Sequence, residues 1–383
     1  MIWNQLPDLE NIKNHLVNLH QQNQLPHAIL FKGEDGSGAL PLALGFVQYL
    51  YCDNPKNNLP CGECKSCKQT KNLFYPGFQL LIPKFSTSQK NENDDETNVT
   101  KVFLQSFSEN IFISFDDLLN KLKGKNKQAS ISTQDIHTVI ESVSYSAVGN
   151  KYNIIVIWKP ELMLPAAANK LLKTLEEPPP QTLFLLVSSN PEELLPTIIS
   201  RVQQINIPNY SEIDCIDYLI NKFNTEPTTA QEISKICNGN LNKAIHILTN
   251  FDEYVELLND FKEFARLSIK YDLNNIDKFI SKFEDRGREY LKRFLEYSLD
   301  IFHYALLQNY NASHLIKSTQ QEKEFISKFY LYAHESNIPK LYEIFNDAYH
   351  HAVRNANIRI LLNDLFLRCN ELLKKKPTTN VQN

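Results

Sequence analysis

Two short, unbroken runs of apolar residues stand out in the middle of the chain. Residues 154–157 read Ile-Ile-Val-Ile and residues 182–187 read Thr-Leu-Phe-Leu-Leu-Val, and each has the length of a strand buried on both faces. Between them, residues 166–177 are rich in Ala, Leu, Lys and Glu, which favour a helix, and the three prolines at 178–180 end it. This order predicts a right-handed βαβ unit whose strands lie parallel in one sheet.

The residues on either side of this unit predict more of the same α/β domain. Strands are expected at residues 25–31 and 79–83, and helices at 11–20, 42–50 and about 132–143. Residues 85–127 look like an insertion. Its stretch 90–98 is too polar to bury a core, so we expect a mobile loop there. We interpret the four lysines between 121 and 127 as a solvated face, and no role for the insertion follows from the sequence.

From about residue 208 onward the pattern is almost wholly helical. Three short helices, at about 211–223, 230–237 and 241–248, predict a small helical domain over residues 208–250. Residues 251–375 predict a second helical domain, and the tail 376–383 is polar and expected to be disordered. The six helices of the second domain, each with one apolar stripe, are expected at 254–268, 273–284, 288–307, 320–336, 338–352 and 358–373.

Length and charge agree with this organisation. The chain has 383 residues, 42% of them hydrophobic, and a formal net charge of −4, so we expect two or three domains with ordinary cores. No apolar segment is long enough to span a bilayer and residues 1–5 do not resemble a signal peptide, so we expect a cytoplasmic protein with no membrane contact. Without an overall positive charge, any contact with nucleic acid must be local or supplied by partners.

Four of the seven cysteines are close together in the sequence. Cys52, Cys61, Cys64 and Cys67 have the spacing C-x8-C-x2-C-x2-C, and four thiolates can complete a tetrahedral shell around Zn²⁺. Four sulfurs leave no open position for water, so the predicted zinc site is structural. The alternative is four unrelated free thiols, which the clustering disfavours. The other three cysteines are expected to pack in the core: Cys215, Cys237 and Cys369.

A glycine-rich turn follows the first predicted strand. Gly33, Gly36 and Gly38 give it the backbone of a G-x-x-x-x-G-K-[ST] phosphate loop, but Ala39 stands in the place of the lysine and Leu40 in that of the hydroxyl residue. The charge that binds phosphate is therefore absent. The alternative is an ordinary strand-to-helix turn. The position of the turn, before an apolar helix and upstream of the βαβ unit, favours a degenerate nucleotide loop.

One longer motif resembles bacterial clamp-loader subunits of the AAA+ class. It comprises residues 167–179 (Ala-Ala-Asn-Lys-Leu-Leu-Lys-Thr-Leu-Glu-Glu-Pro-Pro) and residues 199–201 (Ile-Ser-Arg). The resemblance implies an AAA+ RecA-like α/β domain with a parallel sheet over residues 1–207, a helical lid over 208–250 and an all-α collar over 251–375 that joins the subunits of a hetero-oligomer. Clustered cysteines also occur in this family, which supports the zinc prediction.

Within this family, the chain resembles the subunits that do not hydrolyse ATP. Trp158 and Lys159 stand where ATPase members have an Asp-Glu pair, and neither can hold magnesium or activate water. Asn242 stands where an ATP-binding lid has an arginine. Arg201 is retained, and the resemblance implies that it acts in trans as an arginine finger on the ATP of a neighbour.

The resemblance also implies the partners. They are γ/τ-type ATPase subunits and a δ subunit, with the sliding clamp and primed DNA reached through the assembled complex.

Two other functions stay open. An active γ/τ-type ATPase would need five chemical groups that the sequence lacks. A zinc-dependent nucleic-acid-binding module would need a basic surface around the cysteines, where Lys65, Lys68 and Lys71 are the only nearby excess.

Overall fold

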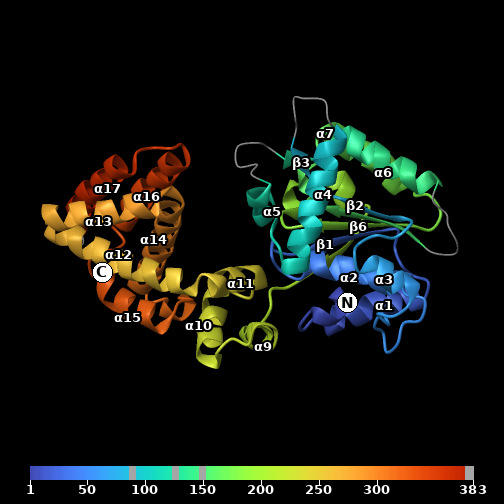
Figure 1. Cartoon of the computed structure of the whole chain (residues 1–383), viewed down its shortest axis with the longest axis horizontal. Coiled ribbons are helices and arrows are strands. Elements are labelled where there is room, and N and C mark those ends of the chain that lie inside the picture. The colour runs from blue at the N-terminus through green and yellow to red at the C-terminus, as the bar shows by residue number, and fades with distance from the viewer. Residues whose placement is uncertain (86–91, 123–128, 146–151, 376–383) are drawn as a thin grey trace, which may run out of the picture. The chain divides into compact units, whose positions relative to one another are not determined.

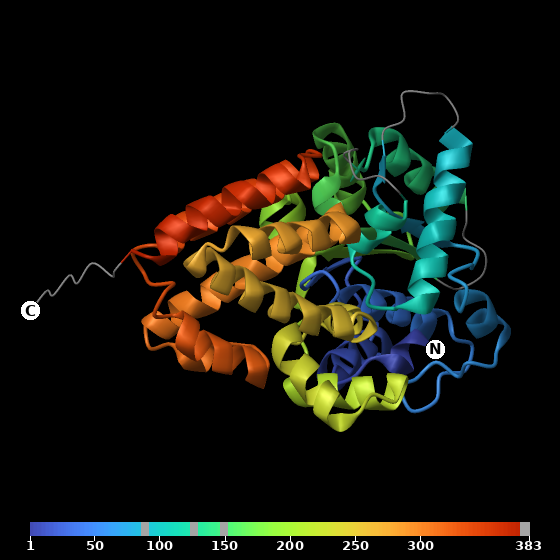
Figure 2. The same cartoon turned by 60° about the vertical axis from the view of Figure 1, so that its left-hand side comes forward.

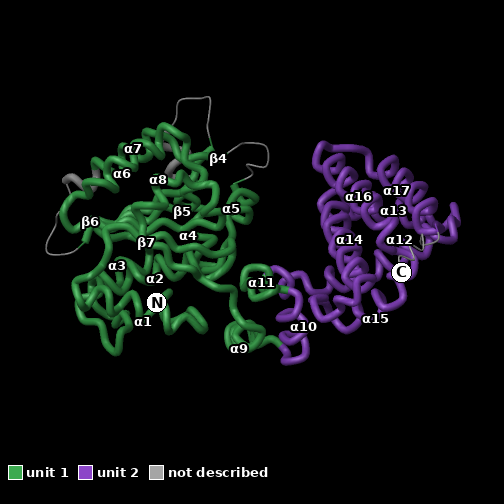
Figure 3. Tube along the Cα trace, turned by 180° about the vertical axis from the view of Figure 1, so that it is seen from behind, with its two compact units in different colours: residues 1–225, 237–245 green, residues 226–236, 246–383 purple. Residues whose placement is uncertain are grey.

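The chain forms two compact units, which Figure 3 distinguishes by colour. Unit 1 consists of residues 1–225 and 237–245, and unit 2 of residues 226–236 together with the chain from residue 246 onward. The predicted division into three domains, with boundaries at residues 208 and 251, stays a prediction. The computed structural model describes residues 1–85, 92–122, 129–145 and 152–375.

Unit 1 is built on a five-stranded parallel sheet with the strand order β2-β5-β6-β1-β7 (Figure 1). Asn153 of β5 lies opposite Thr182 of β6, and α7 (Pro165–Glu176) connects these neighbouring strands. The βαβ unit predicted from the two apolar runs is therefore confirmed. The strands of the sheet are β1 (Ala28–Lys32), β2 (Phe78–Leu81), β5 (Asn153–Trp158), β6 (Thr182–Ser188) and β7 (Gln203–Asn206).

Helices cover both faces of the sheet, which explains why β5 and β6 are apolar at nearly every position. On one face, Ile155 and Ile157 of β5 belong to the same buried cluster as Ile136 of α6 (Thr133–Tyr145) and Leu171 of α7. The opposite face is covered by two other helices. α2 (Ala39–Tyr51) packs on β5 and β6, and α4 (Glu92–Glu109) brings the Phe103 ring to 5.5 Å from that of Trp158.

The insertion is mostly helical, and the expected mobile loop is wrong for residues 92–98, which form the first half of α4. Residues 90 and 91 lie outside the described residues. The physical reason is the second half of the helix: Val99, Phe103 and Phe107 recur every four residues and are all buried, so they attach the helix to the domain. Figure 1 shows α4 in front of the sheet, and Figure 2 shows it at the side of the sheet.

After α4 the insertion continues through α5 (Phe115–Lys121). A short antiparallel ribbon of β3 (Lys84–Phe85) and β4 (Ala129–Ser130) closes it. Of the four lysines interpreted as a solvated face, Lys121 is half exposed and pairs with Glu109; the other three lie outside the described residues. The remaining helices of unit 1 are α1 (Glu10–Gln21), α3 (Lys65–Thr70), α8 (Pro196–Ile199) and α9 (Glu212–Phe223), with 3₁₀ turns at Ile2–Gln5, Pro160–Leu162 and Pro191–Glu193.

Unit 2 is wholly helical in its described part, as the apolar stripes predict. Its core is rich in phenylalanine, for example Phe264, whose ring centroid lies 4.5 Å from that of Phe366. The predicted fold class, a parallel α/β domain followed by helical domains, is confirmed. The helices are α12 (Phe251–Lys270), α13 (Leu273–Arg286), α14 (Arg288–Asn309), α15 (Gln320–Phe329), α16 (Ile338–Val353) and α17 (Ile358–Leu373), with a 3₁₀ turn at Ser313–Leu315; α10 (Pro227–Cys237) and α11 (Leu241–Thr249) each contribute residues to both units.

The helix predicted at 320–336 ends earlier, at Phe329. Asn337 holds the chain that follows in a different conformation. Its Oδ1 accepts a hydrogen bond from the backbone N–H of His334, and its Nδ2 donates to the carbonyls of Tyr332 and Leu372. An asparagine that satisfies several backbone groups competes with helix formation. No helix in the described part of the chain is long and apolar enough to cross a membrane.

We expect Phe103→Ala to lower the free energy of unfolding of unit 1 by about 3 kcal/mol, because it removes a fully buried ring from α4. The two tryptophans, Trp3 and Trp158, both lie in unit 1, so urea unfolding followed by tryptophan fluorescence reports on this unit alone. The exposed Gln105 on the same helix provides the control, since Gln105→Ala should change the unfolding free energy by less than about 0.5 kcal/mol. Equal effects of the two substitutions would show that α4 is not part of the core.

Candidate functional site: a degenerate nucleotide site and a cysteine cluster

The glycine-rich loop and the pair Trp158 and Lys159, which the sequence singles out, meet Ser189 at the carboxyl ends of the strands. The glycine-rich loop, residues 33–38, follows β1; Trp158 and Lys159 end β5; and Ser189 follows β6. Ligands of open parallel sheets bind at this edge, next to the place where the strand order changes direction. The structure therefore puts the degenerate loop where a nucleotide site is expected.

The glycines of the loop are required by close packing within the protein. Gly36 has φ +80°, which disfavours any side chain, and a Cβ on it would lie 2.5 Å from the Cβ of Asn242. A Cβ on Gly38 would lie 2.5 Å from the hydroxyl oxygen of Tyr210. Tyr210 and Asn242, which follow the last strand of the sheet in the sequence, thus occupy the space beside the loop.

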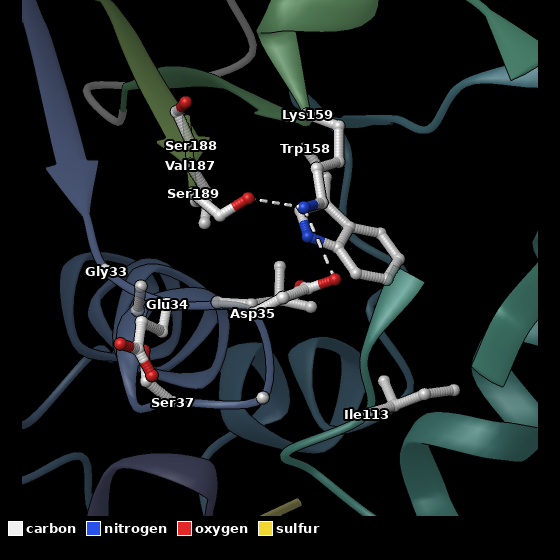
Figure 4. A pocket seen from close by; sticks show the side chains of 13 residues that line it. Gly33, Glu34, Asp35, Ser37, Ile113, Trp158, Lys159, Val187, Ser188 and Ser189 are labelled. Carbon is white, nitrogen blue, oxygen red and sulfur yellow. Dashed lines mark hydrogen bonds and ion pairs between the residues drawn. The ribbon is translucent and has the colours of Figure 1, made fainter. Parts of the chain in front are cut away.

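Lys159 fills the centre of the site, as Figure 4 shows. Its Nζ donates to Ser189 Oγ at 2.6 Å and lies 3.3 Å from Asp35 Oδ2 and 3.9 Å from Glu161 Oε1, and its side chain is only 10% exposed. The backbone of Lys159 adopts the left-handed conformation, φ 58° and ψ 55°, which is uncommon for a lysine. A cation of the chain itself therefore lies at the end of β5.

Asp35 is the counter-charge within the loop. Besides the ion pair with Lys159, its Oδ2 accepts the backbone N–H of Phe115 at 2.8 Å. Burial raises the pKa of Asp35, while the charge of Lys159 and these hydrogen bonds act in the opposite direction. The acid would repel a phosphate, so the loop carries a charge of the wrong sign for a nucleotide.

Little free volume is left between these side chains. The cavity bordered by the loop, Trp158, Lys159 and Ile113 has a volume of about 10 Å³, the scale of a single water molecule. The indole of Trp158 is flanked by Phe103 and Phe115, with ring centroids at 5.5 and 5.4 Å. This arrangement has no room for the phosphates of a nucleotide.

A wider groove of about 340 Å³ lies next to this cavity, at the ends of β1 and β7. Two carboxylates line it, from Glu34 and Glu192, together with the single cation of Lys32. Asn209 Nδ2 donates to Glu34 Oε2 at 2.8 Å. The balance of charge in this groove does not favour a phosphate.

The four clustered cysteines come together as predicted, with all their sulfur atoms within 4.8 Å of one another. Cys52 follows α2, Cys64 caps α3, and Cys67 lies inside α3. Sγ of Cys61 lies 3.9 Å from Sγ of Cys67, close to the separation of roughly 3.8 Å that sulfurs have around a tetrahedral Zn²⁺. The cluster can hold a metal ion.

Backbone N–H groups point at these sulfurs. Those of Cys61, Cys64 and Cys67 donate to the sulfurs of Cys52, Cys61 and Cys64 at 3.2, 3.4 and 3.3 Å, respectively. The hydrogen bond from Cys64 is the main cause that lowers the pKa of Cys61 to about 6, whereas burial raises the pKa values of Cys52 and Cys67. Donors aimed at sulfur favour thiolates, the form that binds zinc. The other three cysteines are buried, as expected.

Arg201 lies away from the degenerate loop, just after α8. Its Nη2 pairs with Glu176 Oε1 at 2.6 Å, and its Nη1 donates to the carbonyl of Thr197 at 2.9 Å and to Ser200 Oγ at 3.2 Å. The side chain is about one third exposed, at 34%. In the free chain, then, the guanidinium contacts its own subunit and also reaches the surface.

A match to a protein-family profile assigns the chain to a family. A sequence profile described as "DNA polymerase III, delta subunit" matches residues 9–211, which is more than half of the 383 residues. The chain belongs to this family. The family resemblance noted in the sequence is therefore confirmed.

The curated proteins with similar sequences are also subunits of DNA polymerase III. The DNA polymerase III subunit delta' of Bacillus subtilis is 26% identical over 255 residues, which cover 66% of this chain and 63% of that protein. The subunit delta' of Escherichia coli is 28% identical over 195 residues, covering 51% of this chain and 45% of that protein. The subunit tau/gamma of Haemophilus influenzae is 28% identical over 210 residues, covering 55% and 24%. The matched region thus spans less than two thirds of each relative.

Solved structures of similar proteins include a DNA polymerase III gamma-subunit-related protein from Thermotoga maritima. It has 16% sequence identity and a TM-score of 0.37, with 96% of this chain and 99% of that chain covered. The Bacillus subtilis DNA clamp loader delta protein has 8% identity and a TM-score of 0.34, with 95% and 100% covered.

Sequence reasoning missed the groups that fill the nucleotide site. By its sequence position Lys159 indicates only a missing carboxylate, whereas in the structure its charge is paired with Asp35. Asp35 is a sequence signal for this pairing. A buried carboxylate inside a glycine-rich loop is stable only with a cation or hydrogen-bond donors beside it. No local signal identified Phe103 and Phe115, since their contact with Trp158 joins segments more than 40 residues apart.

Lys159→Met should lower the unfolding free energy of unit 1 by roughly 3 kcal/mol near neutral pH, because the carboxylate of Asp35 loses its cation. Burial already raises the pKa of Asp35 above its usual 3.8, and the substitution raises it further. The loss should therefore shrink as the pH falls and Asp35 takes up a proton, and grow as the pH rises through the pKa of the folded state. Urea unfolding, followed by tryptophan fluorescence at about pH 4 and pH 7.5, measures both values.

Two further variants separate the ion pair from simple loss of packing. Adding Asp35→Asn to Lys159→Met should remove most of the pH-dependent part of the loss, leaving only the more distant Glu161. Lys173→Met, at an exposed position of α7, should have little effect at either pH. An equal loss for Lys159→Met at both pH values would contradict the role of the ion pair.

Proposed function

We propose that this chain is a non-hydrolysing, delta'-type subunit of a bacterial DNA polymerase III clamp loader, which helps to load the sliding clamp onto primed DNA. One observation carries the proposal: the nucleotide site is closed by the ion pair of Lys159 and Asp35 and retains about 10 Å³. Membership of the family supports the assignment to the polymerase III machinery.

An active γ/τ-type ATPase is the main alternative, and the tau/gamma relatives make it worth weighing. Hydrolysis needs a phosphate-binding lysine, a magnesium ligand and a group that orients water. The corresponding positions carry Ala39, Leu40, Trp158 and Lys159, and all four side chains are buried. The chain by itself is therefore proposed not to be an enzyme.

The proposed chemical contribution of the chain is Arg201, acting in trans on ATP held by a neighbouring γ/τ-type subunit. A guanidinium is always charged and can bridge two phosphate oxygens. Its present partner, Glu176, is half exposed, and an exposed ion pair contributes only about 0.2–1 kcal/mol. Exchange of this carboxylate for a γ-phosphate would therefore cost little. The alternative is that Arg201 only stabilises the turn after α8 through Thr197 and Ser200.

The proposed partners are the γ/τ-type ATPase subunits and a delta subunit, in a hetero-oligomer joined through a collar at residues 251–375. Exposed aromatic side chains in this region support an interface, since tyrosine, tryptophan and phenylalanine are enriched where proteins meet. A groove of about 500 Å³ between α16 and α17 adds a concave surface. The exposed side chains include Tyr310, Leu331, Tyr332, Tyr342, Ile360 and Leu367.

The proposed cofactor is one structural Zn²⁺ held by Cys52, Cys61, Cys64 and Cys67. The clustering of the four sulfurs and the donors aimed at them support it. When bound, the ion would tie the segment after α2 to α3 and would supply no catalytic step, because its four ligands leave no position open.

A zinc-dependent nucleic-acid-binding module is the second alternative. Lys65 and Lys68 line a shallow groove with the exposed Phe74, and Lys71 is exposed nearby. Cations beside an aromatic ring suit single-stranded nucleic acid. Four thiolates around Zn²⁺ would carry a net charge of about −2, however, which offsets most of the local positive charge. The family match therefore favours the clamp-loader assignment.

Arg201→Ala should leave the complex assembled but lower ATP turnover at the adjoining site by about 10³-fold, because the developing charge on the γ-phosphate loses its guanidinium. The measurement is steady-state ATP hydrolysis by the reconstituted complex, with native mass measurement to confirm its composition. Glu176→Gln is the matched control: it removes the partner within the chain and keeps the arginine, so turnover should be retained. Equal defects in both variants would indicate a structural role for Arg201.

Cys64→Ser should reduce the zinc content of the purified protein and lower its melting temperature, because one of four ligands is lost. Metal analysis of the purified chain should give one zinc per native molecule. Cys369→Ser, in the core of unit 2, is the control; it also removes a buried thiol but should leave the zinc content unchanged. A native protein without stoichiometric zinc, whose melting does not respond to a chelator, would refute the metal assignment.

A further inference from the structure

The insertion between β2 and β4 contacts each of the three positions at which the nucleotide-binding chemistry has been lost. These are the phosphate loop, the end of β5, and Asn242, which stands where an ATP-binding lid has an arginine. The contacts come from residues 92–122, to which the sequence assigned no role. All of the residues concerned belong to unit 1.

At the phosphate loop and at β5, the insertion supplies the contacts that close the site. The backbone N–H of Phe115 donates to Asp35 Oδ2 at 2.8 Å, as an N–H group can do for a phosphate oxygen in a nucleotide-binding protein. Phe115 and Phe103, both at most 5% exposed, pack their rings against Trp158. The insertion thus supplies a hydrogen-bond donor to the loop and two buried rings to the end of β5.

At the lid position, the insertion binds Asn242 through both ends of its amide. Asn110 Nδ2 donates to Asn242 Oδ1 at 2.7 Å, and Asn242 Nδ2 donates to Asp117 Oδ2 at 2.7 Å. The amide assignment is set by these two partners, because one supplies a donor and the other an acceptor. Asn242 is only 6% exposed, so a missing partner would leave a buried polar atom without a hydrogen bond, which is costly.

Asn242 is also joined to the phosphate loop itself. Its backbone N–H donates to the carbonyl of Gly36 at 3.3 Å, and Asn240 Nδ2 donates to the carbonyl of Asp35 at 2.8 Å. Residues 237–245 therefore touch both the loop and the insertion. In a nucleotide-bound relative of this kind, the lid arginine would make the corresponding link to the ligand.

The insertion is held rigidly where it makes these contacts. Ser114 and Asp117 form a reciprocal capping box at the start of α5, which fixes the carboxylate that receives Asn242. Phe112 is fully buried, and its ring lies 5.8 Å from that of Tyr210 and 5.3 Å from that of Tyr218. The capping box and the buried ring thus hold the segment in the position from which it contacts Asn242.

We propose that residues 92–122 are a built-in ligand of the degenerate site, which replaces a nucleotide in fastening residues 237–245 to the phosphate-loop edge of the sheet. This inference deepens the proposed function and rests on its loss of nucleotide binding. The ligand class is a polar and aromatic peptide segment of the same chain. Unit 1 therefore keeps this connection in every nucleotide state of the complex.

Asn110→Ala in the full-length chain removes the donor to Asn242 and leaves the buried rings of α4 in place. It also removes the Oδ1 that accepts the backbone N–H of Phe112, so Asn242→Ala, which keeps that hydrogen bond, is the second variant. Asn120→Ala is the matched control for Asn110→Ala: Asn120 is an exposed asparagine of α5, on the same insertion. Hydrogen–deuterium exchange, read by mass spectrometry, should show exchange over residues 237–245 accelerated by about tenfold in Asn110→Ala and unchanged in Asn120→Ala. Asn242→Ala should reproduce the acceleration for the remaining amides of that segment.

Three outcomes would overturn the inference. Unchanged exchange over residues 237–245 in both Asn110→Ala and Asn242→Ala would show that the insertion does not fasten the segment. Equal acceleration in the segment and in β5 and β6 would show that the insertion only contributes to general stability. Protection of residues 33–40 of the native protein by added Mg²⁺ and ATP would refute the proposed loss of nucleotide binding as well, which distinguishes a failure of that proposal from a failure of the built-in ligand alone.

Discussion

A buried charge is costly unless it is paired, and in this protein the pairing of Lys159 shapes the carboxyl-terminal edge of the sheet. Lys159 leaves the end of β5 with a left-handed backbone and reaches Asp35 and Ser189, so the glycine-rich loop folds toward the strands. Burial of the pair strengthens the attraction between the charges but also requires that water be replaced by other partners. The N–H of Phe115 supplies one of them, which ties the insertion to the same centre.

The parts of this architecture that depend on local pattern could be predicted. The strands at β5 and β6 are uniform apolar runs because helices cover both faces of the sheet, and the spacing of the four cysteines brings their sulfurs together. The parts that depend on distant partners could not. Residues 92–98 look like a loop by composition, yet they continue a helix that Phe103 and Phe107 attach to the domain. Likewise, the end of α15 depends on hydrogen bonds that Asn337 makes beyond the helix.

The buried groups around Lys159 and the surface residue Arg201 differ in how firmly the structure holds them. The groups around Lys159 are buried and joined by several hydrogen bonds, so they resist rearrangement. Arg201 lies at the surface and is bound through an exposed carboxylate and two uncharged oxygens. The groups around Lys159 therefore form a fixed interior, whereas the guanidinium of Arg201 can change its partner without disturbing that interior.

The packing of Gly36 against Asn242 bears on how readily a nucleotide site could be regained. A lysine in place of Ala39 would add a second cation to a region that already buries Lys159, at a position that is only 3% exposed. An arginine in place of Asn242 would lose the two hydrogen bonds that the amide of Asn242 makes with the insertion, to Asn110 and to Asp117. Each reversal is thus unfavourable until the insertion has moved away. Regaining the chemistry of a phosphate loop would therefore require several of these changes together, since each one alone would destabilise unit 1.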